Sequence, residues 1–167
     1  MSYSKLSQNH INYFINILGN ENVIYDQDIR NYSSDHTEDL VYLPEVVLFP
    51  ETTNQVSEIV SYCNENFIPI TPSAALTGLS GGALPIFRGV SLSTKKMNKL
   101  IEINTKNFQA TVEPGLINED FQNELERYGL FYPPDPASKG SCTIGGNIAL
   151  NAGGPRAVKY GVTSNYI

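Results

Sequence analysis

The chain of 167 residues is 41% hydrophobic and 17% charged and carries a net charge of −6, which is typical of one soluble globular domain. It contains no run of about 18 apolar residues and begins without the basic start and apolar stretch of a signal peptide, so we expect no membrane span and a cytoplasmic location. No basic run is interleaved with aromatic residues, which argues against nucleic acid as a partner.

The first predicted element is an amphipathic helix near the N-terminus. Its apolar residues recur at helical spacing and stop at a glycine: Ile11, Phe14, Ile15, Leu18 and Gly19. The stretch from residue 23 to residue 42 is acidic and has no clear period, so we interpret it as a short helix and loops. Residues 1–42 are therefore expected to form a helical lead-in, and residues 43–167 the main domain.

Alternating strands and helices follow the lead-in. Residues 46–49 are expected to form a short buried strand, Thr52 or Thr53 to cap a helix, and residues 67–71 to return as a strand. One face of that helix is apolar and carries Val56, Ile59, Val60 and Cys63. In such a β-α-β unit we expect the two strands to be parallel neighbours.

Three more strands and one more helix complete the pattern. The strands are expected at residues 90–93, 100–104 and 109–113. Asn118 is expected to cap the helix, Gly129 to end it, and its inner face to carry Phe121, Leu125 and Tyr128. The predicted fold class is α+β, with helices packed on a mixed sheet.

Glycine and charge are unevenly distributed along the chain. Residues 1–66 carry ten acidic and two basic side chains, whereas residues 67–167 carry seven acidic and nine basic ones and hold twelve of the 13 glycines. Glycine without acidic neighbours suits an anion, because backbone N–H groups can approach it and carboxylates do not repel it. The second half of the chain is therefore where we expect an anion to bind.

The first glycine segment, residues 72–83, directly follows the strand expected at residues 67–71. Its small residues let the backbone curl so that several N–H groups can face one phosphate, and Thr77 and Ser80 could add hydroxyl groups. The segment has neither the G-x-G-x-x-G nor the G-x-x-x-x-G-K-[ST] pattern, so a Rossmann or P-loop site is not indicated. A tight turn without a ligand is the alternative.

The second glycine segment spans residues 132–154 and starts with an extended stretch fixed by three prolines. Ser141 or Thr143 is expected to cap a short helix whose N–H groups and positive end would face an anion. Small residues would let a flat ring lie against the backbone, with Asn147 and Asn151 as polar contacts. The alternative is a core helix packed closely against a sheet.

Seven short motifs, taken together, resemble one known family. They are Pro69-Ile70-Thr71-Pro72, Thr77-Gly78-Leu79-Ser80-Gly81-Gly82-Ala83, Val112-Glu113-Pro114-Gly115, Pro134-Asp135-Pro136, Ile144-Gly145-Gly146-Asn147, Asn151-Ala152-Gly153-Gly154 and Tyr160-Gly161. Over roughly residues 40–167 the chain resembles the FAD-binding domain of the vanillyl-alcohol oxidase and p-cresol methylhydroxylase (PCMH) family. Within it, the chain is most similar to the D-lactate dehydrogenase and glycolate oxidase flavin-subunit branch.

The resemblance implies a PCMH-type FAD-binding fold, whose first subdomain has a parallel or mixed sheet flanked by helices and preceded by an N-terminal helix. It also implies FAD as the cofactor, with its diphosphate on the first glycine segment and its flavin and ribityl groups on the second. The residues carried over for phosphate are Thr77, Gly78, Ser80, Gly81 and Gly82. Those carried over for the flavin and ribityl groups are Pro134, Ser138, Gly145, Gly146, Asn147 and Asn151. The two segments are expected to face a common cleft.

The first glycine segment departs from the family pattern Pro-Arg-Gly-Ala-Gly-Thr-Gly, because Ser73, Ala74 and Leu76 replace an arginine and two glycines. A positive φ at Leu76 would cost about 1 to 2 kcal/mol. Each charge-assisted hydrogen bond lost to the phosphates would cost about 1.5 to 3 kcal/mol more. Leu150 also stands where many members have a glutamate. These changes are expected to weaken FAD binding.

The function implied by the resemblance is the FAD-binding portion of a flavin-dependent oxidoreductase that oxidises a 2-hydroxy acid of the glycolate or D-lactate type. In the family, the metal-binding and substrate-binding side chains follow the segment that matches this chain, and His10 and His36 fit no catalytic motif. We therefore predict no catalytic residue and no metal site, and we expect the chain to be inactive alone and to self-associate through an exposed sheet edge. The alternative is a truncated, non-catalytic remnant or a partner-dependent binding module without bound FAD.

Overall fold

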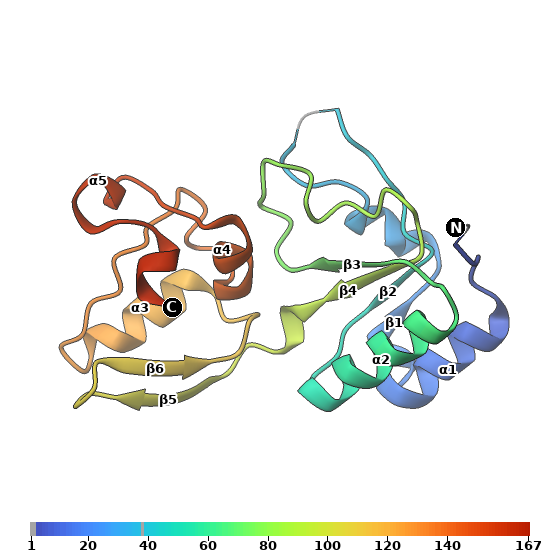
Figure 1. The fold of residues 1–167 in the computed structure, drawn as a ribbon, viewed down its shortest axis with the longest axis horizontal. Coiled ribbons are helices and arrows are strands. Elements are labelled where there is room, and N and C mark those ends of the chain that lie inside the picture. The colour runs from blue at the N-terminus through green and yellow to red at the C-terminus, as the bar shows by residue number, and fades with distance from the viewer. Residues whose placement is uncertain (1–2, 38) are drawn as a thin grey trace. The chain divides into compact units, whose positions relative to one another are not determined.

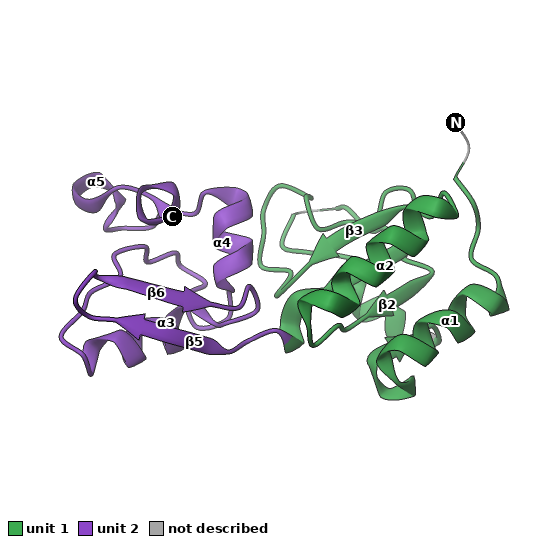
Figure 2. Ribbon diagram, turned by 60° about the horizontal axis from the view of Figure 1, so that its bottom comes forward, with its two compact units in different colours: residues 1–96 green, residues 97–167 purple. Residues whose placement is uncertain are grey.

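The structure, a computed structural model, describes residues 3–37 and 39–167. The chain divides into two compact units, with the boundary between Lys96 and Met97 (Figure 2). Each unit has its own sheet and its own hydrophobic core. No helix among the described residues has the length and apolar character needed to cross a membrane.

The first unit is built on a four-stranded sheet with the strand order β1-β2-β4-β3 (Figure 1). β1 is antiparallel to β2 and the other pairs are parallel, so the predicted mixed sheet is confirmed. The helices are α1 (Gln8–Leu18) and α2 (Thr53–Glu65), the 3-10 turns are η1 (Asn20–Asn22), η2 (Gln27–Tyr32) and η3 (Thr94–Lys96), and the strands are β1 (Val23–Ile24), β2 (Val46–Leu48), β3 (Ile70–Ser73) and β4 (Val90–Ser93).

The prediction that β2 and β3 are neighbours is wrong, because β4 lies between them. Val90 of β4 pairs with Val46 on one side and with Ile70 on the other. All four residues of β4 are buried, which suits a central strand, whereas Pro72 in β3 has no N–H group and suits an edge. β1 and β3 are thus the edges of this sheet, and self-association through an edge stays a prediction.

The helices of the first unit begin and end where the sequence indicates. Gly19 follows α1 with a φ of 83°, and the Thr52 side chain accepts a hydrogen bond from the Gln55 N–H at the start of α2. The strand after α2 starts later than predicted, because Phe67 has a φ of 54°, which lies outside the strand region. The sequence therefore predicts the ends of these helices, which depend on local capping residues, more accurately than the start of this strand.

The core of the first unit joins α1 and α2 to the sheet. Its fully buried members include Phe14 of α1, Ile59 and Cys63 of α2, and Leu48 and Val90 of the central strands. Burial raises the pKa of the Cys63 thiol to about 12, so it stays protonated at neutral pH and is not a nucleophile. Cys63 is a small core residue, as predicted.

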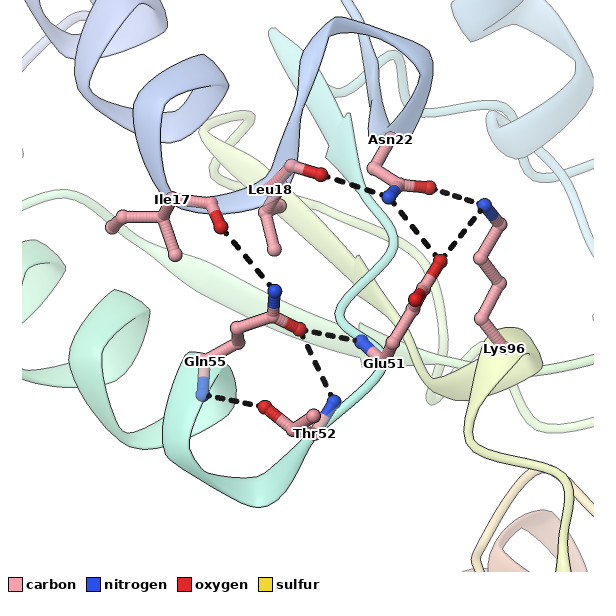
Figure 3. A network of polar contacts seen from close by, with 7 residues as sticks. All are labelled: Ile17, Leu18, Asn22, Glu51, Thr52, Gln55 and Lys96. Atoms are coloured by element: carbon pink, nitrogen blue, oxygen red, sulfur yellow. Dashed lines mark hydrogen bonds and ion pairs between the residues drawn. The ribbon is translucent and has the colours of Figure 1, made fainter.

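A polar network lies at the start of α2 (Figure 3). Asn22 is 4% exposed; it donates a hydrogen bond to the Leu18 carbonyl at 2.8 Å and accepts one from the Lys96 ammonium group. Lys96 also forms an ion pair with Glu51 at 3.2 Å, and the Gln55 side chain donates to a carbonyl of α1. The network therefore ties the end of α1, the chain after β2 and the last residue of the first unit together.

We predict that Asn22→Ala lowers the free energy of unfolding by about 2 kcal/mol, because it leaves the Leu18 carbonyl without its side-chain donor in a buried place. Urea unfolding followed by far-UV circular dichroism measures the change. Asn20→Ala, at an exposed position of the same turn, is the control and should change stability by less than about 0.5 kcal/mol. Equal effects of the two substitutions would show that the network contributes no stability.

The second unit combines a hairpin with short helices. Its elements are β5 (Leu100–Asn104), β6 (Gln109–Val112), α3 (Asn118–Glu126), α4 (Ile144–Leu150), α5 (Ala157–Tyr160) and the 3-10 turn η4 (Thr163–Tyr166). β5 and β6 form an antiparallel sheet of their own instead of extending the mixed sheet. The core of this unit contains Phe121 and Leu125 of α3, Tyr132 and Ile144.

Asn118 is not the cap that the sequence predicts. Ile117 holds the cap position of α3, and Asn118 is the first helical residue and fully buried. Its amide group donates to the Pro134 carbonyl at 3.3 Å, and its carbonyl oxygen accepts from the Asn147 side chain at 3.0 Å. A buried amide must be hydrogen-bonded, so Asn118 links α3 to the start of the second glycine segment and to α4 within it.

Candidate functional site

The first glycine segment leaves the carboxyl end of β3, as predicted. The Ser73 hydroxyl at this end lies 3.1 Å from the Ser91 hydroxyl of β4, which fixes the point where the segment starts. The backbone then takes a positive φ at Leu76 (57°) and again at Gly81 (69°). Both turns bend the segment back on itself, and the one at Leu76 occurs at a residue for which this conformation is strained.

Several N–H groups of this segment have no acceptor. Among the described residues, those of Thr77, Gly78, Ser80 and Gly82 donate no hydrogen bond, whereas that of Gly81 donates to the Thr37 hydroxyl at 2.8 Å. Backbone N–H groups without partners in a curled, small-residue segment are what an anion requires. Four of the five residues predicted to hold phosphate therefore have an N–H group available for a ligand, whereas the Gly81 N–H already has a partner.

No acidic residue lies near the first glycine segment along the chain. Residues 66–101 contain no aspartate or glutamate and include Arg88, Lys95 and Lys96. Ser80 and Gly82 are exposed, so a ligand could reach this part of the backbone from solvent. The segment thus combines accessible donors with a stretch of chain that has no carboxylate of its own.

The second glycine segment includes α4, and Thr143 is its cap. The Thr143 hydroxyl accepts a hydrogen bond from the Gly146 N–H at 3.3 Å, so of the two predicted caps the structure selects Thr143. The Ile144 and Gly145 N–H groups donate to the carbonyls of Leu116 and Pro114, both within 2.9 Å. The prediction that this helix offers N–H groups to an anion is therefore wrong, because its first turn is satisfied within the unit.

Gly145 is needed for packing. A Cβ atom on Gly145 would lie 2.8 Å from the Cβ atom and 2.9 Å from the carbonyl oxygen of Pro114. At Gly146 the nearest atom to such a Cβ would be the Thr143 hydroxyl at 3.3 Å. The start of α4 thus matches the alternative given for the second glycine segment, a closely packed core helix.

The polar residues predicted at this segment also have partners within the second unit. Asn147 is 3% exposed, and its amide group donates to Asn118. Asn151 ends α4 with a φ of 48°, and its side chain accepts from the Ser164 N–H at 2.9 Å. Pro134 is fully buried and its carbonyl accepts from Asn118, whereas Ser138 is half-buried in a turn.

The backbone crosses itself closely beside Pro134. The Asp135 N–H donates to the Gly153 carbonyl at 3.2 Å, and a Cβ atom on Gly154 would lie 2.0 Å from the Asp135 carbonyl oxygen. The Asp135 carboxylate forms ion pairs with Lys139 at 3.5 Å and Arg156 at 3.4 Å. The Pro134-Asp135-Pro136 and Gly153-Gly154 motifs are therefore in contact and hold this segment in shape.

The two histidines and Tyr132 have surroundings that the structure describes. His10 accepts a hydrogen bond from the Ser7 N–H at the start of α1, and His36 is exposed. Burial raises the pKa of the Tyr132 hydroxyl, so it is not a base at neutral pH. Within the described residues no three His, Cys, Asp or Glu side chains form a group that could hold a metal ion.

Comparison with known proteins identifies the class of fold. In the solved structure of p-cresol methylhydroxylase with substrate bound, the matching part superposes with a TM-score of 0.75 at 28% identity and covers 90% of this chain and 31% of that one. A family model described as FAD binding domain matches residues 44–167. The fold is thus the α+β, PCMH-type FAD-binding fold that the resemblance implied.

The chain belongs to the FAD-binding domain family, and the prediction of FAD as the cofactor is confirmed. It is 41% identical to a D-lactate dehydrogenase of Anaerostipes hadrus, over 99% of this chain and 35% of the relative. It is 45% identical to the glycolate oxidase subunit GlcD of Bacillus subtilis (strain 168), over 81% of this chain and 29% of the relative. The chain thus spans about a third of the length of these curated relatives.

The residues of the first glycine segment fit the diphosphate of FAD. Thr77, Gly78, Ser80 and Gly82 have N–H donors of the kind that its negative oxygens require, and residues 66–101 contain no carboxylate. The second glycine segment fits differently, because the N–H groups of Gly145 and Gly146 are already bonded. This segment can offer a small-residue surface to a ring, but not helix N–H groups to an anion.

We predict that Gly145→Ala lowers the free energy of unfolding by about 2 to 3 kcal/mol, because its Cβ atom overlaps the Pro114 backbone. Gly146→Ala is the matched control in the same turn and should stay within about 1 kcal/mol of the wild type, since alanine favours helix and only Thr143 must shift. Thermal unfolding by circular dichroism measures both. A Gly145→Ala protein as stable as Gly146→Ala would contradict the close packing of α4.

We predict that Leu76→Gly raises the free energy of unfolding by about 1 kcal/mol, because glycine adopts a positive φ without strain. Leu79→Gly, at a neighbouring exposed position without a positive φ, is the control and should give no gain. Both values come from urea unfolding under identical conditions. A loss of stability in Leu76→Gly would show that the side chain contributes more packing than the conformation costs.

Proposed function

We propose that this chain supplies the FAD-binding portion of a flavin-dependent oxidoreductase that oxidises a 2-hydroxy acid. The two curated relatives carry the names of a D-lactate dehydrogenase and a glycolate oxidase subunit, and both D-lactate and glycolate are 2-hydroxy acids. Bound FAD would supply a ring that can take up a hydride from the carbon that bears the hydroxyl group. The role of this chain is then to bind and orient the cofactor.

The observation that carries the proposal is the set of unpaired N–H groups in the first glycine segment. We assign the diphosphate to Thr77, Gly78, Ser80 and Gly82, with Gly81 as the turn that brings them together. Hydrogen bonds to a charged oxygen contribute about 1.5 to 3 kcal/mol each, so a few of them are enough to anchor a dinucleotide.

The same proposal assigns the flavin and ribityl groups to the second glycine segment. The residues concerned are Pro134, Ser138, Gly145, Gly146, Asn147 and Asn151. Because most of their polar groups already have partners, we expect this segment to contribute mainly van der Waals contacts and shape. The anchoring energy then comes mainly from the diphosphate end of the cofactor.

Two observations favour a second candidate, a binding module that does not hold FAD by itself. Leu76 is strained at a φ of 57°, and Ser73 offers no positive charge where family members carry arginine. Retention of flavin distinguishes the two. Purified protein that keeps the absorption bands of FAD after gel filtration supports the first proposal, and colourless protein that gives no heat on titration with FAD supports the second.

We predict that Gly82→Asp weakens FAD binding at least about tenfold, because its carboxylate would face the diphosphate among the N–H groups. Gly82→Ala is the matched control and should bind as the wild type does, since a Cβ atom there meets only the Ser80 hydroxyl at 3.8 Å. Isothermal titration with FAD measures the affinities, and the loss in Gly82→Asp should shrink at 1 M salt. Equal FAD affinities of Gly82→Asp and Gly82→Ala would contradict the assignment of the diphosphate to this segment.

A further inference from the structure

We propose that Thr37 is a positioning residue for the diphosphate segment: its hydroxyl group holds Gly81 so that the neighbouring N–H groups face the phosphates. The inference rests on the proposed function of the first glycine segment. Thr37 lies 44 residues before Gly81, in the acidic loop that we define as residues 33–37 and 39–42. No sequence motif indicated this loop.

Two hydrogen bonds from the acidic loop hold the first glycine segment on either side of its tip. The His36 N–H donates to the Gly78 carbonyl at 3.0 Å, and the Thr37 hydroxyl accepts from the Gly81 N–H at 2.8 Å. Between these two anchors lie Leu79 and Ser80, whose N–H groups donate to no acceptor in the described part of the chain. The contacts therefore fix the ends of the turn and leave its donors available.

The acidic loop is itself held in place. The Tyr42 N–H donates to the Ser33 carbonyl at 2.8 Å, which closes the loop at its base. The Thr37 N–H donates to the Asp35 carboxylate at 2.8 Å, which sets the position of the threonine. The hydroxyl group that reaches Gly81 thus comes from a defined turn and not from a free side chain.

The conformation of Gly81 makes an external anchor useful. Its φ of 69° is one that glycine reaches as readily as others, so an unanchored glycine here would sample many directions. A hydrogen bond to Thr37 holds the turn in one conformation before the ligand arrives. The free energy of binding then does not have to offset the entropy cost of ordering the turn. A Cβ atom on Gly81 would lie 3.4 Å from the Leu40 side chain, so the other side of this turn also meets the acidic loop.

Thr37 could instead compete with the phosphate for the Gly81 N–H. In that case its removal would strengthen FAD binding, whereas removal of a positioning group weakens it. The two roles therefore predict opposite signs for one substitution. We infer positioning because the contacts lie at both ends of the turn, at Gly78 and Gly81, and not at its tip.

The test is the FAD affinity of Thr37→Val, which keeps the shape of the side chain and removes the hydroxyl group. We expect about a tenfold loss, equivalent to about 1.4 kcal/mol, and restoration in Thr37→Ser, which keeps the hydroxyl group. Riboflavin, which has no phosphate, should bind the wild type and Thr37→Val equally. A general loss of structure would instead weaken the binding of both FAD and riboflavin. Thr53→Val, at an exposed threonine that begins α2, is the control and should not change FAD affinity.

The outcomes separate this inference from the proposed function. A wild-type protein that binds FAD no better than riboflavin overturns both. A wild-type protein that binds FAD, together with Thr37→Val binding equally well or more tightly, overturns the positioning role alone. If Thr37→Val loses affinity for riboflavin to the same extent as for FAD, the effect is on folding, and the inference is also overturned.

Discussion

The first unit depends on the pairing of β4 with a parallel strand on each side. β4 is buried along its whole length and hydrogen-bonds to β2 and to β3. A parallel neighbour requires the chain to cross from the carboxyl end of one strand to the amino end of the next. The chain that leaves β3 must therefore return to the start of β4, and the first glycine segment lies on this return.

Gly89 makes the return possible. It has a φ of 66°, and a Cβ atom there would lie 2.4 Å from the carbonyl oxygen of Pro69, the residue before β3, so only glycine lets the chain pass this close. Its carbonyl accepts from the Glu45 N–H at 2.7 Å and its N–H donates to the Glu45 carboxylate at 3.2 Å. Because strands fix both of its ends, the segment between them has little conformational freedom. A loop without regular structure can therefore present donors in a defined arrangement.

The two glycine segments use glycine for different physical reasons. In the first, small residues leave backbone N–H groups uncovered and without partners among residues 3–37 and 39–167. In the second, Gly145 and Gly154 allow backbone segments to touch, at Pro114 and at Asp135, and the N–H groups near α4 are bonded inside the unit. Similar composition thus leaves backbone donors available in one place and allows close packing in the other, and only the hydrogen-bond partners distinguish the two.

The sequence by itself determined the features that depend on neighbouring residues: the period and caps of α1 and α2, the strands β2, β4, β5 and β6, and the motifs that identify the family and its cofactor. Tertiary structure decided what depends on residues far apart. Examples are the place of β4 between β2 and β3, the buried amide pair of Asn118 and Asn147, the bonded N–H groups of α4, and the contact of Thr37 with Gly81. The physical reason is that a cap or an apolar period acts over a few residues, whereas a hydrogen bond between distant segments leaves no mark in either segment alone.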